Sequence, residues 1–264
     1  MKLFIITKFV LTEHWSIYQT ENRNNIKGIK KILFKKIAQN ASKIMPVSYQ
    51  LKDAMIEFGL MGDFTIVPNT VDIDIFPFKE KEQLSPFKFL HISTLVDKVK
   101  NVSGILQSFS KLLEIDSDNI LTIVSDGDIQ PFINLAKQLN IPDCNIRFFG
   151  TQTAKEISQF YHQNHVFILF SNYENLPVVI IESFATGTPV ISSNVGGISH
   201  FFPKDFGYLI PKKDEKALLD SMIKIKQNYQ NFPFPKMTEY AEHTFSNKSI
   251  SKLYSNIYKE ILNR

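Results

Sequence analysis

Short apolar runs alternate with amphipathic stretches along residues 87–192. The apolar runs predict strands at Phe87–Ile92, Leu121–Val124, Ile146–Phe149, His165–Phe170 and Pro189–Ser192. Helical spacing of apolar residues between these runs predicts helices at Val102–Leu113, Pro131–Leu139, Ala154–His162 and Pro177–Thr186. Regular β–α alternation predicts a parallel, doubly wound α/β sheet, in which ligands bind at the carboxyl ends of the strands.

A shorter alternation precedes this region. It predicts strands at Leu3–Ile6, Ile44–Val47 and Phe64–Val67 and helices at Ile26–Ala38 and Ser48–Phe58. Prolines and a charged cluster then indicate an interdomain linker. We therefore divide the chain into a partial amino-terminal domain (1–72), a linker (73–86), a carboxyl-terminal domain (87–245) and a final helix (246–264) expected to pack back on the amino-terminal part.

Charge is unevenly distributed along the 264 residues, whose net charge is +4. Residues 1–60 contain ten basic and four acidic side chains, a net of +6, which indicates a local contact surface and not a nucleic-acid-binding protein. The single Cys144 cannot form an intrachain disulfide, so a cytoplasmic setting is expected. Because no apolar run reaches the roughly 18–20 residues of a membrane-spanning helix, membrane contact is expected to be peripheral, at the inner face.

The predicted helix Ile26–Ala38 is basic and amphipathic. One face carries Ile26, Ile29, Leu33 and Ile37, and another carries Lys27, Lys31 and Lys35. Two interpretations remain open. The apolar face packs on the sheet and the lysines are solvated, or the helix docks on an anionic membrane.

The stretch SNYENLPVVIIESFATGTPVISSNVGG, residues 171–197, follows a predicted buried strand and opens a helix. Pro177 suits the first helical turn, so the backbone amides near Asn175 and Leu176 are available to an anion. Glu174 and Glu182 lie roughly 10–12 Å apart along the helix axis, at 1.5 Å per residue. That separation is too long for the paired carboxylates of a glycosidase and suits hydroxyls at the two ends of a diphosphate-bridged ligand.

These residues carry a family resemblance. The run ENLPVVIIE, followed by GTPVI and VGGI, resembles the signature of glycosyltransferase family 4, which contains the "glycosyl transferases group 1" domain. The similarity extends to ASKIMPVSYQLKDAM, IVPNTVDIDIF and FLHISTLVDKVKNVSGILQSF and covers most of the chain. It implies a GT-B fold with a complete carboxyl-terminal Rossmann-like domain and the remaining part of an amino-terminal Rossmann-like domain.

The resemblance also implies roles for individual residues. Glu182 would bind the donor ribose, and Glu174, with the amides of Asn175 and Leu176, would bind the donor sugar and diphosphate. Lys100 would stabilise the leaving diphosphate, and His14 would lie near the donor sugar. Thr94 occupies the position of a phosphate-binding arginine. The family retains anomeric configuration and uses no metal, so neither a metal nor another cofactor is expected.

Each assignment has a simpler alternative. Glu174, Glu182 and Lys100 could be solvated surface charges, and His14 could cap a turn. Gly150, Gly196 and Gly197 are weaker candidates for ligand contact, because glycines also serve tight turns. Ser199 and His200 replace the family's usual Pro and Glu.

The expected partners are a UDP-, GDP- or ADP-linked sugar and a glycan or lipid-linked acceptor. The family carries a further amino-terminal stretch, so we expect a truncated glycosyltransferase. Two other functions remain open, a nucleotide-sugar-binding module without turnover and a nucleotide-sugar epimerase of the same fold.

Overall fold

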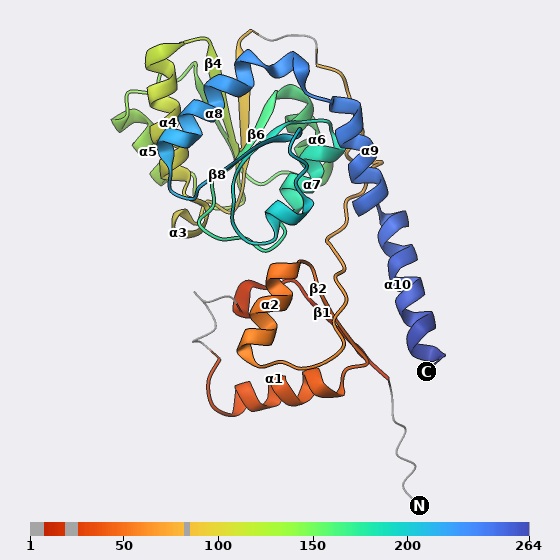
Figure 1. Ribbon diagram of the computed structural model, residues 1–264. Helices are drawn as coiled ribbons and strands as arrows, with labels where there is room; N and C mark the ends of the chain where they lie inside the picture. The colour runs from red at the N-terminus through yellow and green to blue at the C-terminus, as the bar shows by residue number, and fades with distance from the viewer. Residues whose placement is uncertain (1–7, 19–25, 82–84, 264) are drawn as a thin grey trace, which may run out of the picture.

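A computed structural model describes residues 8–18, 26–81 and 85–263. Two parallel sheets form the framework, one in each half of the chain. The carboxyl-terminal half forms the larger layered body, and the amino-terminal half lies below it in Figure 1. The α/β fold class predicted from the β–α alternation is confirmed.

The larger sheet has six parallel strands in the order β5-β4-β3-β6-β7-β8. Its strands are β3 (Phe87–Ile92), β4 (Asn119–Val124), β5 (Ile146–Phe149), β6 (Val166–Leu169), β7 (Val190–Ser193) and β8 (Gly207–Ile210). The first five coincide with predicted strands to within two residues at each end. The strand order reverses direction between β3 and β6, where doubly wound sheets bind ligands.

Helices cover both faces of this sheet. They are α3 (Asp97–Lys100), α4 (Val102–Ile115), α5 (Gln130–Gln138), α6 (Ala154–Gln163), α7 (Val178–Ala185) and α8 (Glu215–Gln227). Buried side chains of α4, α5 and α8 share one core cluster, and those of α6 and α7 share the other. Thr153 and Glu156 form a reciprocal capping box that fixes the start of α6.

The smaller sheet pairs β1 (Val10–Glu13) with β2 (Lys43–Pro46) in parallel. The predicted strand Leu3–Ile6 lies outside the described residues. The predicted strand Phe64–Val67 is wrong, since only an isolated bridge joins Phe64 to Ile44. The amides of Thr65 and Val67 donate to β2, but Pro46 has no N–H to return a bond, so a regular ladder does not form.

Helices α1 (Ile29–Asn40) and α2 (Tyr49–Phe58) flank this sheet, with a short 3-10 turn, η1, at Ser16–Tyr18. Gly28 has φ +57° and starts α1 three residues later than predicted. Ile26 is therefore buried apart from the helix, whereas Ile29, Leu33 and Ile37 are exposed. The interpretation that this apolar face packs on the sheet is wrong for the described residues.

The two halves are joined at two neighbouring crossings. The first crossing follows Val71, where the chain leaves the amino-terminal half, and the second follows Phe245, at the end of α9 (Phe234–Phe245). The Val71 amide and the Thr70 hydroxyl both donate to the Phe245 carbonyl, so the two crossings lie side by side. Helix α10 (Asn247–Leu262) then runs back along the amino-terminal half (Figure 1). Its Ile250, Ile257 and Ile261 form a core cluster with Met45 and Val67. The chain therefore crosses between the halves twice at one place.

Candidate functional site

The carboxyl ends of β3, β4, β5 and β6 enclose a cavity of about 390 Å³, called here the central cavity. Its polar lining comprises Ser93, Thr94, Lys100, Ser125, Asp126, Thr151, Gln152 and Glu174. The sequence predicted a ligand site at these strand ends. The structure brings Thr94, Lys100 and Glu174 together there.

Lys100 and Glu174 form an ion pair in this cavity. The Lys100 Nζ lies 2.5 Å from Glu174 Oε1, and the two side chains are only 17% and 11% exposed. The Ser171 hydroxyl donates to the same carboxylate oxygen at 2.7 Å. A partly buried, mutually neutralised pair is not a pair of solvated surface charges.

The position of Lys100 follows from the turn between α3 and α4. Asn101 adopts a left-handed conformation, with φ 49°, which ends α3 directly after Lys100. The Asp97 carboxylate accepts from both the amide and the hydroxyl of Ser103 and ties the two helices together. The turn that follows Lys100 is therefore held on both sides, by α3 and by α4.

Helix α7 begins at Val178 with Pro177 as the residue before it, one position later than predicted. The Asn175 side chain donates to the His14 carbonyl at 2.7 Å, and the Leu176 carbonyl accepts from Asn69 at 2.6 Å. These side chains dock the loop before α7 onto the amino-terminal half. The amino end of α7 faces the central cavity, where helix amides favour an anion.

His14 lies at the junction of the two halves. Asn69 donates its amide N–H to Leu176, so its Oδ1 faces His14 Nδ1 at 2.8 Å. An amide oxygen only accepts, so Nδ1 carries a proton and Nε2 of the neutral ring is an acceptor. Asn69 thus fixes the tautomer of His14, a role that sequence reasoning missed although the PNTVD motif contains Asn69.

Glu182 lies mostly buried on α7, outside the residues that line the central cavity. The Tyr161 hydroxyl lies 3.2 Å from Glu182 Oε2 and 2.8 Å from the Val179 carbonyl. Burial raises the pKa of Glu182 to about 7, and the Tyr161 hydrogen bond opposes that rise. Sequence reasoning did not identify Tyr161.

His91 and Ser93 form a second unpredicted pair. Burial lowers the pKa of His91 to about 4, so its ring is neutral. Its Nδ1 donates to the Ile168 carbonyl at 2.9 Å, and Nε2 therefore accepts from the Ser93 hydroxyl at 2.7 Å. Ser93 lines the central cavity, and its hydrogen bond to His91 fixes the direction of its hydroxyl group. The available signal was a histidine at the penultimate position of a strand that opens on the site.

The three candidate glycines serve different purposes. Gly196 has φ +61°, and a Cβ there would overlap the Glu174 carbonyl. A Cβ on Gly197 would overlap the Ser48 side chain across the junction of the halves. These two glycines permit close backbone packing. Gly150 is exposed next to Thr151 and has open space around it.

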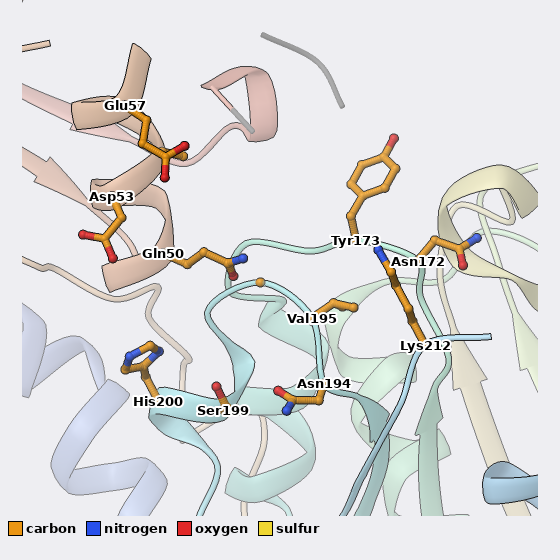
Figure 2. Close-up of a pocket in the computed structure, with 12 residues that line it drawn as sticks. Gln50, Asp53, Glu57, Asn172, Tyr173, Asn194, Val195, Ser199, His200 and Lys212 are labelled. Atoms are coloured by element: carbon orange, nitrogen blue, oxygen red, sulfur yellow. The ribbon is translucent and has the colours of Figure 1, made fainter. Parts of the chain in front are cut away.

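A larger cavity of about 630 Å³, called here the junction cavity, lies between α2 and the carboxyl-terminal half. Figure 2 shows Gln50, Asp53 and Glu57 on α2 at one side and Tyr173, Asn194 and Lys212 at the other. Ser199 and His200 also line it, and the His200 ring lies 5.1 Å from that of Tyr49. Loop 172–175 contributes to both cavities, so they are neighbours.

Within residues 8–18, 26–81 and 85–263, no group of three or more His, Cys, Asp or Glu side chains is arranged to hold a metal ion. Over the same ranges, no helix has the length and apolar character needed to cross a bilayer.

Comparisons with known proteins agree with this geometry. Residues 72–244 match the family model described as "Glycosyl transferases group 1". The chain is 29% identical over 179 residues to N-acetyl-alpha-D-glucosaminyl L-malate synthase of Bacillus anthracis, covering 66% of this chain and 45% of that protein. It is 24% identical over 233 residues to UDP-Gal:alpha-D-GlcNAc-diphosphoundecaprenol alpha-1,3-galactosyltransferase of Escherichia coli, covering 82% and 59%.

The fold resembles solved glycosyltransferase structures along almost its whole length. Anabaena HepE, solved in complex with UDP, superposes with a TM-score of 0.82 at 16% identity, covering 96% of this chain and 72% of that one. The chain spans about half the length of the curated relatives it matches. These structural neighbours establish that the two sheets belong to a GT-B fold.

Proposed function

The chain belongs to the glycosyl transferases group 1 family, and from that premise we propose that it is a family 4 glycosyltransferase that moves a sugar from a nucleotide-sugar donor to a glycan or lipid-linked acceptor. The observation that carries this proposal is the ion pair between Lys100 and Glu174 at the amino end of α7. The pair supplies a cation for a diphosphate and a carboxylate for sugar hydroxyls in one cavity.

In the proposed complex, the donor diphosphate lies between Lys100 and the amides before α7. Glu174 accepts hydrogen bonds from the donor sugar, and Glu182 accepts them from the ribose. The hydroxyls of Ser93 and Thr94 line the same cavity and offer further neutral contacts to the diphosphate. The assignment of Lys100, Glu174, Ser93 and Thr94 is supported by their positions in one cavity at adjacent strand ends. The role given to Glu182, which lies on α7 outside that lining, is supported by the family resemblance.

The proposed chemistry is transfer with retention. The bond from the anomeric carbon of the sugar to the diphosphate oxygen breaks, and the acceptor oxygen bonds to that carbon on the same face. The proton of the acceptor hydroxyl passes to the departing diphosphate oxygen. Lys100 stabilises the negative charge that builds on the leaving diphosphate. The proposal gives this role to Lys100 and not to a metal, so EDTA is expected to leave donor binding unchanged. His14 lies next to the loop that carries Glu174, on the acceptor side of the donor sugar.

The junction cavity is the proposed acceptor site, because it adjoins the central cavity through loop 172–175. Its carboxylates, amides and the Tyr173 ring are groups that bind sugar hydroxyls and sugar faces. The galactosyltransferase relative of Escherichia coli has a diphosphoundecaprenol-linked sugar in its name. That relative supports a lipid-linked glycan as one acceptor class.

Thermal unfolding with UDP, GDP and ADP tests the donor site. We expect one of the three to raise the Tm, because a ligand that binds only the folded state stabilises it. Glu182→Ala is expected to abolish the rise, whereas Glu156→Ala, on the exposed capping box of α6, should keep it. The absence of any rise with all three nucleotides far above a plausible Kd would refute the donor site.

Release of free nucleotide from the matching sugar donor separates an enzyme from a binding module. We expect release to increase when a lipid-linked glycan extract is added. A nucleotide-dependent rise in Tm with no release under any acceptor condition would assign the chain to nucleotide-sugar binding without turnover.

A further inference from the structure

Helix α1 turns its apolar side chains outward. Ile29 is 84% exposed, Ile32 68%, Leu33 51% and Ile37 37%. At 3.6 residues per turn these four residues occupy one face of the helix, called here the α1 outer face. Large aliphatic side chains gathered on one solvent-facing surface usually mark an interaction site.

The opposite face of α1 is fixed against the rest of the amino-terminal half. Ala38 is fully buried and Phe34 packs against the core. The Lys31 Nζ lies 5.0 Å from the centre of the Phe58 ring on α2, a cation–π contact. A rotation of α1 that buried the outer face would break all three contacts, so the apolar face remains outward.

The charged side chains of α1 are all positive. Residues 26–40 contain five lysines and no acidic residue, the lysines being Lys27, Lys30, Lys31, Lys35 and Lys36. Lys36 lies within the outer face, Lys30 lies at its border, and both are exposed. Their long aliphatic stems let the ammonium groups extend beyond the neighbouring isoleucines.

We propose that the α1 outer face docks on an anionic lipid bilayer, with the helix lying in the plane of the interface. The aliphatic side chains enter the boundary of the acyl chains, and the lysines contact acidic headgroups. A second copy of the same face would place like charges opposite each other, which disfavours self-association. This inference does not depend on donor binding.

The placement of α1 allows the protein to work while docked. In Figure 1, α1 lies on the side of the amino-terminal half that faces away from the carboxyl-terminal half. The central and junction cavities involve α2 and the carboxyl-terminal half, and no residue of α1 lines them. A bilayer on the α1 outer face therefore leaves both cavities accessible.

Co-sedimentation of the full chain with vesicles tests the proposal. We expect binding to vesicles of phosphatidylcholine with one third phosphatidylglycerol and little binding to phosphatidylcholine alone. Raising the salt from about 0.1 M to about 1 M shortens the Debye length from about 10 Å to about 3 Å and should release the protein. Lys30→Glu with Lys36→Glu should weaken binding at least about tenfold.

One further double variant of the α1 outer face, with two matched control variants, separates this face from general surface effects. Ile29→Ser with Leu33→Ser should also abolish binding. The control Ile115→Ser with Leu262→Ser removes two other exposed aliphatic side chains, far from α1 in the sequence, and should not. Lys111→Glu with Lys155→Glu makes the same change in net charge as Lys30→Glu with Lys36→Glu, but at exposed positions of the carboxyl-terminal half. This control should reduce vesicle binding much less.

Equal binding by the wild type and all four variants would overturn the proposal, and so would equal binding to neutral and acidic vesicles. Sedimentation velocity provides a third decisive result. A dimer that Ile29→Ser with Leu33→Ser converts to a monomer, without any vesicle binding, would assign the face to self-association instead.

Discussion

The Lys100 ammonium and the Glu174 carboxylate lie 2.5 Å apart and neutralise each other inside the central cavity. Ser171 donates to the same carboxylate, so Glu174 retains a partner when Lys100 turns toward another anion. In the proposed complex, the Lys100 ammonium pairs with the diphosphate, and Glu174 keeps the Ser171 hydrogen bond. Before a ligand binds, the ion pair holds the cation in the cavity without leaving either charge uncompensated.

Replacing Lys100 by Met should weaken nucleoside diphosphate binding about ten- to a hundredfold, because a charge-assisted hydrogen bond contributes roughly 1.5–3 kcal/mol. Isothermal titration calorimetry provides the Kd. The matched control is Lys98→Met, which removes an exposed lysine from the same short helix. Similar losses in the two variants would show that long-range charge, and not contact with Lys100, attracts the ligand.

The raised pKa of Glu182 predicts opposite pH trends for stability and binding. Its folded-state pKa of about 7 lies above the ordinary value of 4.5, so the folded protein holds this proton more tightly than the unfolded chain. The contribution of Glu182 to stability therefore falls as the pH rises from 4.5 to about 7, by at most about 3 kcal/mol. Ionised Glu182 accepts more hydrogen bonds from hydroxyls, so nucleotide affinity should rise over pH 6–8.

Glu182→Gln provides the comparison, because the amide does not titrate. The difference in Tm between the two proteins should grow in favour of the variant as the pH rises toward 7. Nucleotide affinity of the variant should be low and should keep only the pH dependence that comes from the terminal phosphate of the ligand, whose second pKa is about 6. If the wild type and the variant show the same pH profile, Glu182 does not control binding.

Tyr161→Phe should move the pH midpoint of nucleotide binding upward, since the Tyr161 hydrogen bond lowers the pKa of Glu182. The single Tyr161 proton is shared between Glu182 Oε2 and the Val179 carbonyl, so its loss should also lower stability, by about 0.5–1.5 kcal/mol. Tyr229→Phe, at a similarly buried tyrosine, is the control and should leave the midpoint unchanged. An unchanged midpoint in Tyr161→Phe would limit Tyr161 to packing.

Gly196→Ala should lower the Tm by several degrees and impair binding, whereas Gly150→Ala should be nearly neutral. The first substitution places a Cβ against the Glu174 carbonyl at a left-handed φ of +61°, which costs about 1–2 kcal/mol before any overlap is counted. The second meets open space. Differential scanning fluorimetry of both variants distinguishes a packing role for Gly196 from a general effect of added methyl groups.

The periodic part of the fold was predictable from sequence, and two short strands were not. Strands β3 and β5 have the predicted bounds because their apolar runs end at clear turns. Strand β8 is only four residues long, begins with Gly207 and is half-buried, so its pattern does not differ from that of a loop. Strand β1 is similarly short and only partly buried.

The site was predictable where a motif or a strand end carries it. Lys100, Thr94 and Glu174 follow strands, and parallel strands bring their carboxyl ends to one edge. Tyr161 and Asn69 act through hydrogen bonds to residues 21 and 55 positions away in the chain. Periodicity indicates which face a residue occupies but not which distant atom it contacts, so these partners required the structure.

The two neighbouring crossings between the halves restrict how the protein can open. Thr70 and Val71 are hydrogen-bonded to Phe245, and Thr70 also contacts Asn247, so both connections are held together at one edge of the molecule. Two connections that lie side by side form a hinge, so the two halves should separate by rotating about this edge. The junction cavity should therefore widen or narrow as the halves rotate, while the contacts at the hinge are kept.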